Sequence, residues 1–355
     1  MKKVVAVITL VAISLRLMTL AGALEKTGEW LRELTADGKL AMASLSLGLG
    51  ASFSDEFSSD TEAHSYNIYA APKVSMLSES APPTETPASE EFGESEEGER
   101  SVSPEIKATT IYGGLTISNA MGFSPNIPAL MTEGWSGSLP PDGPQILIIH
   151  THGSEAYTPD TNSVYAESDT ARTQDKNYNV VRVGDELGSS LEKYGLNVLH
   201  DREIYDYPSY SDSYKRSMAA IERHLAENPA IAIVIDLHRD ALGSNEVVYK
   251  TVADIEGDSS SQLMMLVGTG ENGLSHPNWE ENLRLALTLQ SAINQKYPTL
   301  ARPVALKQER YNQHLTTGSM ILEVGSSGNT LSEALCAVRL YADAIAPLLS
   351  KLITN

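Results

Sequence analysis

Mostly apolar runs of four to seven residues alternate with helix-patterned segments from residue 146 to the C-terminus. Runs of this length are typical of strands buried on both faces of a sheet. The predicted strands cover 146–149, 196–199, 231–237, 247–252, 263–267 and 320–324, and the predicted helices cover 178–194, 213–227, 279–295 and 331–349. This alternation predicts an α/β fold, a three-layer sandwich with a mostly parallel central sheet.

Local signals mark the ends of two of these helices. Gly195 follows the helix predicted at 178–194 and suits a C-cap, since glycine adopts the left-handed conformation without strain. Thr330-Leu331-Ser332-Glu333 has the spacing of a capping box, which predicts the start of the last helix. A short strand and turn are expected within 106–123, ahead of the main sheet.

The N-terminus carries an export or anchoring signal. Met1-Lys2-Lys3 precedes an apolar stretch that reaches Leu24 and is interrupted by Arg16. A basic flank followed by about 20 apolar residues is either a cleavable signal peptide or a membrane anchor. The length favours a single-pass anchor with the rest of the chain outside the cell membrane, facing the wall. Ala21-Gly22-Ala23 offers a cleavage site, and cleavage would make the protein secreted.

The composition changes abruptly between residues 78 and 100, where eight glutamates face one arginine and little is apolar. Such a segment is expected to be a self-repelling, disordered spacer. The expected organisation is therefore an anchor (1–24), a membrane-proximal region (25–77), an acidic linker (78–105) and a catalytic domain (106–355). The net charge of −20 argues against nucleic acid as a partner. The single cysteine, Cys336, excludes an internal disulfide and a cysteine zinc site.

Two predicted strands end at a histidine, which suggests a metal site beyond their carboxyl ends. His150 follows the strand at 146–149, and His238 follows the strand at 231–237. Glu155 lies five residues after His150, across a loop at Gly153. Two histidines and a carboxylate form a common hydrolytic zinc site, so we expect zinc on His150, Glu155 and His238. His152 is the alternative third ligand. Its side chain lies on the same side as that of His150 if the backbone stays extended, and the two diverge if the backbone turns after His150.

Glu323 is a candidate general base. It lies within Met320-Ile321-Leu322-Glu323-Val324, where its carboxylate should be buried, and burial is costly unless the group is paired, protonated or near a cation. Such a carboxylate suits proton abstraction from a water activated by zinc. A salt bridge to Arg239 or Arg310 is the alternative explanation.

The chain resembles the stage II sporulation protein P family from about residue 106 to 350. The resemblance lies in the segments His150-Thr151-His152-Gly153-Ser154-Glu155-Ala156-Tyr157, Asn179-Val180-Val181-Arg182-Val183-Gly184, Asp236-Leu237-His238-Arg239-Asp240-Ala241, His276-Pro277-Asn278-Trp279, Arg310-Tyr311-Asn312-Gln313-His314 and Gly318-Ser319-Met320-Ile321-Leu322-Glu323-Val324-Gly325. It implies an amidase-like fold and a zinc-dependent N-acetylmuramoyl-L-alanine amidase with endopeptidase activity. Its implied substrate is peptidoglycan, hydrolysed during engulfment in sporulation, with stage II sporulation proteins D and M as partners.

The resemblance also implies roles for single residues. It places His150 and His238 on zinc and makes Glu323 the catalytic glutamate. It assigns Arg239, Asn278 and Arg310 to the substrate, with His152 beside them. The related amidases carry a zinc-binding glutamate where this chain reads Asp175-Lys176-Asn177, so Glu155 is expected to replace it. The alternatives are another zinc hydrolase of the wall (a carboxypeptidase or deacetylase) and a wall-binding scaffold without catalysis.

Overall fold

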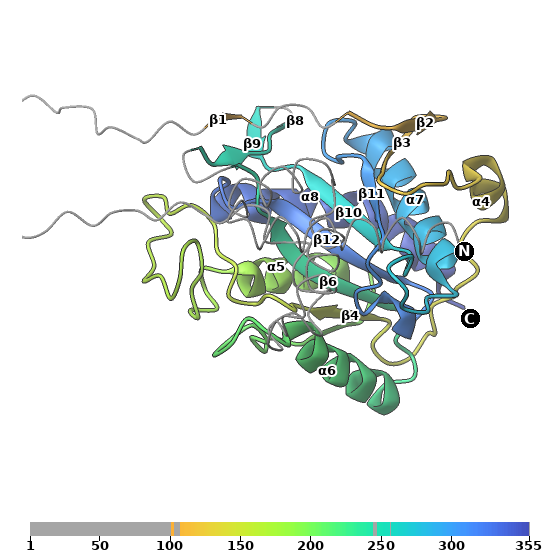
Figure 1. The fold of residues 1–355 in the computed structure, drawn as a ribbon, viewed down its shortest axis with the longest axis horizontal. Helices are drawn as coiled ribbons and strands as arrows, with labels where there is room; N and C mark the ends of the chain where they lie inside the picture. The colour runs from red at the N-terminus through yellow and green to blue at the C-terminus, as the bar shows by residue number, and fades with distance from the viewer. Residues whose placement is uncertain (1–100, 103–106, 244–246, 256, 355) are drawn as a thin grey trace, which may run out of the picture. The chain divides into compact units, whose positions relative to one another are not determined.

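The computed structural model describes residues 101–102, 107–243, 247–255 and 257–354 (Figure 1). The expected anchor and membrane-proximal region lie outside the described residues. So does the expected linker, except for β1 (Ser101–Val102), which pairs in parallel with β7 (Tyr249–Lys250). No helix in the described ranges is both long and apolar enough to cross a membrane.

Within these residues, an eight-stranded sheet forms the centre of the fold (Figure 1). In spatial order its strands are β2 (Thr110–Tyr112), β3 (Leu115–Asn119), β11 (Val304–Lys307), β10 (Leu263–Gly268), β12 (Ser319–Ser326), β6 (Ile233–Asp240), β4 (Ile146–Ile149) and β5 (Val198–His200). The expected strand and turn within 106–123 correspond to the β2–β3 hairpin, which lies at one edge of the sheet.

The sheet is mixed, and the expectation of a mostly parallel sheet is wrong. Strands β12, β6, β4 and β5 are parallel to one another, whereas β10 is antiparallel to β12 and carries β11 and β3 in its own direction. The reversal arises because the chain leaves β6 and returns through β7 and the hairpin β8 (Ala253–Ile255)–β9 (Asp258–Ser260). The described residues of this connection contain no helix of the kind that usually links parallel strands.

Helices cover both faces of the sheet (Figure 1). The larger core packs α5 (Val180–Glu192), α7 (Trp279–Lys296) and α8 (Leu331–Leu349) against one face. On the other face, α6 (Ser213–Glu227) packs against Leu147, Ile149 and Val234. The short helix α4 (Ile127–Glu133) lies against α7, and 3-10 turns occur at η2 (Gln313–Leu315) and η3 (Ser350–Leu352). The predicted capping box at α8 is confirmed.

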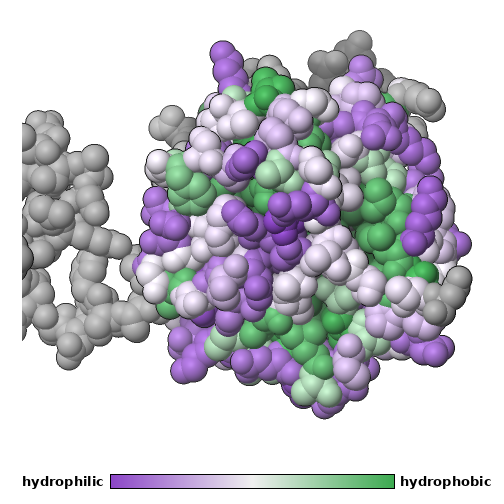
Figure 2. Space-filling model, turned by 90° about the vertical axis from the view of Figure 1, so that its right-hand side faces the viewer, coloured by the Kyte–Doolittle hydropathy of each residue, from purple (hydrophilic) through white to green (hydrophobic). Residues whose placement is uncertain are grey.

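Side-chain alternation along β12 positions the candidate chemistry. Met320, Leu322 and Val324 belong to the larger core, beneath α5, α7 and α8. Ile321 belongs to a different cluster on the α6 side, and Glu323 shares that side because strand residues alternate between faces. The molecular surface shown in Figure 2 is mixed, with several separate hydrophobic patches among polar side chains. Exposed apolar side chains include Ile111 and Tyr112 on the edge strand β2.

Candidate active site

The carboxyl ends of β6 and β12 bring His238 and Glu323 side by side. The two residues are register partners in the parallel pair, so their side chains leave the sheet on the same face. Both are buried, with exposed fractions of 1% and 3%. Asp236, two residues before His238 on the same face, lies with Oδ1 2.9 Å from the Nε2 atom of His238. A strand pair thus holds a histidine between a carboxylate partner and a second carboxyl group.

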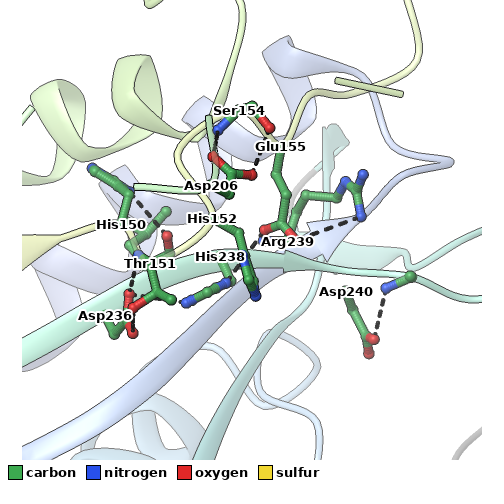
Figure 3. A network of polar contacts seen from close by, with 12 residues as sticks. His150, Thr151, His152, Ser154, Glu155, Asp206, Asp236, His238, Arg239 and Asp240 are labelled. Carbon is green, nitrogen blue, oxygen red and sulfur yellow. Dashed lines mark hydrogen bonds and ion pairs between the residues drawn. The ribbon is translucent and has the colours of Figure 1, made fainter. Parts of the chain in front are cut away.

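A turn after β4 brings His152 and Glu155 to the same place. The strand ends at Ile149, and residues 151–154 form a turn. The ring of His152 lies with its centroid 5.3 Å from that of His238, edge to face. Oε2 of Glu155 lies 3.4 Å from Nδ1 of His238. Figure 3 shows His152, Glu155 and His238 gathered at the centre of one polar network.

His150 is not part of this cluster. Ile146 and Ile148 belong to the larger core, so His150, at the same parity, faces α5 on the opposite side of the sheet from His238. Its Nδ1 atom donates to the carbonyl oxygen of Leu237 at 2.9 Å, and its Nε2 atom lies 2.8 Å from Nε2 of His200. The backbone turn sends His150 and His152 in different directions (Figure 3).

Two arginines hold Glu155 in its ionised form. The backbone N–H of Arg239 donates to Oε2 of Glu155 at 3.2 Å, and the guanidinium group of Arg172 lies 3.5 Å from Oε1. Burial alone would raise the pKa of Glu155, but Arg239, His238 and Arg172 together hold it well below its usual value. Glu155 is therefore a carboxylate with negative charge available for a cation.

The pKa values of the two histidines in the cluster are shifted in opposite directions. Burial would lower the pKa of His238, yet the carboxylates of Asp236 and Glu155 raise it well above its usual value. Burial lowers the pKa of His152 to about 3, and Glu155 opposes this only in part. His152 is therefore a neutral imidazole. Its Nε2 atom meets the hydroxyl of Tyr210 at 3.0 Å, which orients the ring.

Asp236 is itself anchored by the turn. Its Oδ1 accepts from the backbone N–H of Thr151 at 2.8 Å, and its Oδ2 accepts from the Thr151 hydroxyl at 2.6 Å. Carboxylates that bond the outer nitrogen of a histidine commonly fix the ring of a metal ligand. Asp236 lies at ion-pair distance from Nε2 of His238, the position of such a carboxylate, and Nδ1 of His238 is directed toward Glu155.

Glu323 has the environment expected of a proton-transfer group. Its Oε2 atom is buried and, among the described residues, has no hydrogen-bond partner. Burial, assisted by the charge of Asp240, raises its pKa to about 8. The alternative explanation, a salt bridge to Arg239 or Arg310, has no contact to support it in the described part of the chain. Arg239 instead donates to the carbonyl oxygens of Ala156 and Ala171, and Arg310 to that of Ser275.

The donor set of His152, Glu155 and His238 fits zinc chemically: two imidazoles and an ionised carboxylate, buried and supported by outer contacts. Their side chains are packed against one another rather than spread around a common point. Across the described residues, no three His, Cys, Asp or Glu side chains form a ready metal cluster. The residue types present are suitable ligands for a metal. A cation bound between Glu155 and His238 would replace their direct contact.

The expected substrate residues lie in different places. Arg239 is 6% exposed and is engaged by Glu155, Ala156 and Ala171. Asn278 precedes α7, and Arg310 follows β11. Strands β10 and β11 run opposite to β12, so their carboxyl ends lie at the end of the sheet opposite to the carboxyl end of β12. Asn278 and Arg310 follow those carboxyl ends, whereas Glu323 lies near that of β12. The structure does not bring them to the cluster.

Several residues of the site were not anticipated from the sequence. Asp236 could have been found, since it lies two residues before His238 on a predicted strand and therefore shares its face. Arg172, Asp206 and Tyr210 come from loops without a local pattern. Asp206 accepts from the backbone N–H and the hydroxyl of Ser154 (Figure 3). It also pairs with Arg172, and these contacts fix the turn that carries Glu155.

Comparison with known proteins identifies relatives of this chain. It matches the family described as stage II sporulation protein P over residues 49–346. It is 30% identical over 209 residues to the stage II sporulation protein P of Bacillus subtilis strain 168, an alignment that covers 56% of this chain and 49% of that protein. The match thus spans about half the length of this relative.

Some solved structures share a weaker likeness. AmiC2 of Nostoc punctiforme, an N-acetylmuramoyl-L-alanine amidase, is 12% identical over 59% of this chain and 98% of its own, with a TM-score of 0.31. An N-acetylmuramoyl-L-alanine amidase from Clostridium difficile 630 is 15% identical over 59% of this chain and 95% of its own, with a TM-score of 0.32. Ami1 from Mycobacterium abscessus is 11% identical over 60% of this chain and 100% of its own, with a TM-score of 0.34. Similarities of this size assign no activity to the chain.

Proposed function

Because the chain belongs to the stage II sporulation protein P family, we propose that it is a peptidoglycan hydrolase of sporulation. The proposal rests on Glu323, whose buried Oε2 atom has no hydrogen-bond partner among the described residues and which lies beside a cluster of His152, Glu155 and His238. A protein that only binds the wall has no need of a costly buried carboxyl group next to two histidines.

We further propose that the reaction is zinc-dependent amide hydrolysis: an N-acetylmuramoyl-L-alanine amidase with endopeptidase activity on cross-linked stem peptides. His152, Glu155 and His238 would hold the zinc ion, with His152 in the place that the sequence suggested for His150. Zinc bound there would polarise the scissile carbonyl group as a Lewis acid. Asp236 orients His238 through its Nε2 atom, and Tyr210 orients His152.

Glu323 would act as the general base and then as the general acid. Its raised pKa means that it can gain a proton near neutral pH and release it again. It would take a proton from the attacking water and deliver it to the leaving amine nitrogen. Arg239 is assigned to holding Glu155 rather than to the substrate, since its polar contacts are to Glu155 and to backbone carbonyl oxygens.

The cellular setting is also part of the proposal. A single-pass anchor at 1–24 would hold the chain in the cell membrane, and the acidic linker at 78–105 would let the catalytic domain reach the wall. Stage II sporulation proteins D and M are the partners that family membership suggests.

The test measures zinc and products with the full chain. The wild type should bind about one zinc ion, and His152→Ala and His238→Ala should each lose most of it, because two remaining ligands hold zinc poorly. Glu323→Gln should retain zinc and lose about 10²–10⁴-fold in rate. Stoichiometric zinc in a His152→Ala, His238→Ala double variant would refute the metal site.

Product analysis separates the candidate reactions. An amidase releases the stem peptide at the lactyl–alanine junction, and an endopeptidase separates cross-linked peptides without freeing glycan. Release of acetate would identify a deacetylase, and release of single terminal amino acids a carboxypeptidase. Wild-type protein that binds peptidoglycan but yields none of these products would support the scaffold.

A further inference from the structure

A chain of polar contacts links α5 to the strand that carries His238. Oδ1 of Asp185, on α5, lies 3.0 Å from Nδ1 of His200 at the end of β5. Nε2 of His200 lies 2.8 Å from Nε2 of His150, and Nδ1 of His150 reaches the carbonyl oxygen of Leu237 at 2.9 Å. This series of contacts thus ends on the peptide bond that joins Leu237 to His238.

The position of that contact is explained by the length of β4. Backbone pairing between β4 and β6 ends at Ile149 and Asp236, so β6 continues past its neighbour toward His238. The ring of His150 satisfies the next carbonyl group, that of Leu237, where a longer β4 would have offered a backbone N–H. On its other side, β6 remains paired with β12 through Leu237 and His238. On the side of β6 where backbone pairing with β4 has ended, His150 therefore supplies the hydrogen bond that holds the peptide group before His238.

The direction of the hydrogen bonds follows from the acceptor. A carbonyl oxygen can only accept, so His150 carries its proton on Nδ1 and, as a neutral ring, presents a lone pair at Nε2. His200 must then donate from Nε2. Burial lowers the pKa of His200, and the carboxylate of Asp185, 3.0 Å from its Nδ1 atom, opposes this only in part. Arg202, 3.0 Å from the second oxygen of Asp185, fixes that carboxylate. Each side chain in this series of contacts is therefore held by the next one.

We infer that His150, backed by His200, is a positioning residue for His238 that acts through the Leu237 carbonyl and does not bind the metal. The inference rests on the proposed function for its catalytic consequences. It also explains why a histidine lies at the end of β4 on the face opposite the cluster.

A glycine in α5 allows the contact to be broken without altering either histidine. A methyl group at Gly184 would lie 2.6 Å from Nε2 of His200 and 2.7 Å from Nε2 of His150, at the point where the two rings meet, so the rings would have to shift. Gly188, one turn later on the same helix, offers a matched control. A methyl group there would lie 3.6 Å from Val198 and 4.0 Å from Ile148, which is ordinary contact.

The experiment compares four variants of the full chain: His150→Ala, His150→Asn, Gly184→Ala and Gly188→Ala. Zinc affinity is measured by chelator competition, and kcat and KM are measured on peptidoglycan fragments. His150→Ala and Gly184→Ala should bind zinc about 10–100-fold more weakly, the size typical of outer contacts to a ligand, and should lower kcat with little change in KM. His150→Asn should recover much of the loss, because its amide nitrogen can replace Nδ1. Gly188→Ala should match the wild type.

Two results would overturn the inference. If His150→Ala loses zinc as completely as His238→Ala, then His150 is a ligand. If His150→Ala and Gly184→Ala both behave like Gly188→Ala, then the chain of contacts has no role. Should Gly184→Ala fail to fold, the comparison of His150→Ala with His150→Asn decides alone.

Failure of the proposed function is recognised separately. Wild-type protein that binds no zinc and hydrolyses nothing would refute that function, and the positioning role is then read from the ring resonances of His238 in metal-free protein. These should shift in His150→Ala and Gly184→Ala and stay unchanged in Gly188→Ala. Unchanged resonances in all three variants would refute the positioning role as well.

Discussion

The buried carboxyl group of Glu323 should make the metal-free protein less stable as the pH rises. Burial and the charge of Asp240 raise its pKa from 4.5 to about 8. A carboxyl group whose pKa is higher in the folded than in the unfolded state binds a proton on folding. The stability of the folded protein is therefore unaffected below about pH 4.5, falls as the pH rises from about 4.5 to about 8, and stays constant above that.

The size of the effect follows from the same two pKa values. The difference between 4.5 and about 8 corresponds to about 5 kcal/mol, at about 1.36 kcal/mol for each pKa unit. The side chain is 3% exposed, so solvent screening removes little of this. Relaxation around a buried charge reduces such costs, and we expect about 3–5 kcal/mol.

The assay is urea denaturation of wild type and Glu323→Gln with a chelator present, at intervals from about pH 5 to about pH 9. The variant cannot ionise at this position, so its free energy of unfolding should exceed that of the wild type by an amount that grows with pH by about 3–5 kcal/mol. A difference that stays constant across this range would refute the reasoning.

Glu333 supplies a control of opposite sign. Burial would raise its pKa, but its contacts with Asn329, Thr330, Lys250 and Ser259 lower it. The stability that it contributes is therefore present above its unfolded pKa and is lost as the pH falls. Glu333→Gln should accordingly lose stability relative to wild type at neutral pH, and this loss should shrink in acid.

Three further outcomes are expected. Asp236→Asn should weaken zinc binding about 10–100-fold in a chelator competition, because the amide orients His238 less well than a carboxylate; unchanged affinity would argue against this role. Thr330→Ala should cost about 1 kcal/mol in denaturant unfolding, because its hydroxyl caps α8 at the N–H of Glu333; a loss near zero would contradict that contribution. Scrambling residues 78–100 at fixed composition should leave cellular function intact, whereas deleting them should impair it; failure of the scrambled variant would show that the segment carries a recognition sequence.

Local patterns in the sequence predicted the longer helices, the main strands and the burial of key residues, but not α4, β8, β9 or β11. The helix predicted at 213–227 and the strand at 146–149 have the predicted bounds, because their apolar spacing and end signals are local. The same reasoning placed Glu323 in a buried strand and His238 directly after another strand, whereas β6 continues through His238 to Asp240. The capping box marked the start of α8. Each conclusion depends on neighbours only a few residues away.

Tertiary structure alone decided the direction of β10 and the course of the chain after β4. An apolar run indicates burial but not the direction of the strand, so the antiparallel orientation of β10 could not be predicted from the pattern. That orientation takes Asn278 and Arg310 to the end of the sheet opposite to Glu323. The turn after Ile149 likewise sends His150 to α5 and His152 to His238, although the two are only two residues apart. The sequence determined which residues are buried and capable of chemistry. Their arrangement depended on long-range pairing of strands, because only that pairing decides which strand ends, and which faces, meet.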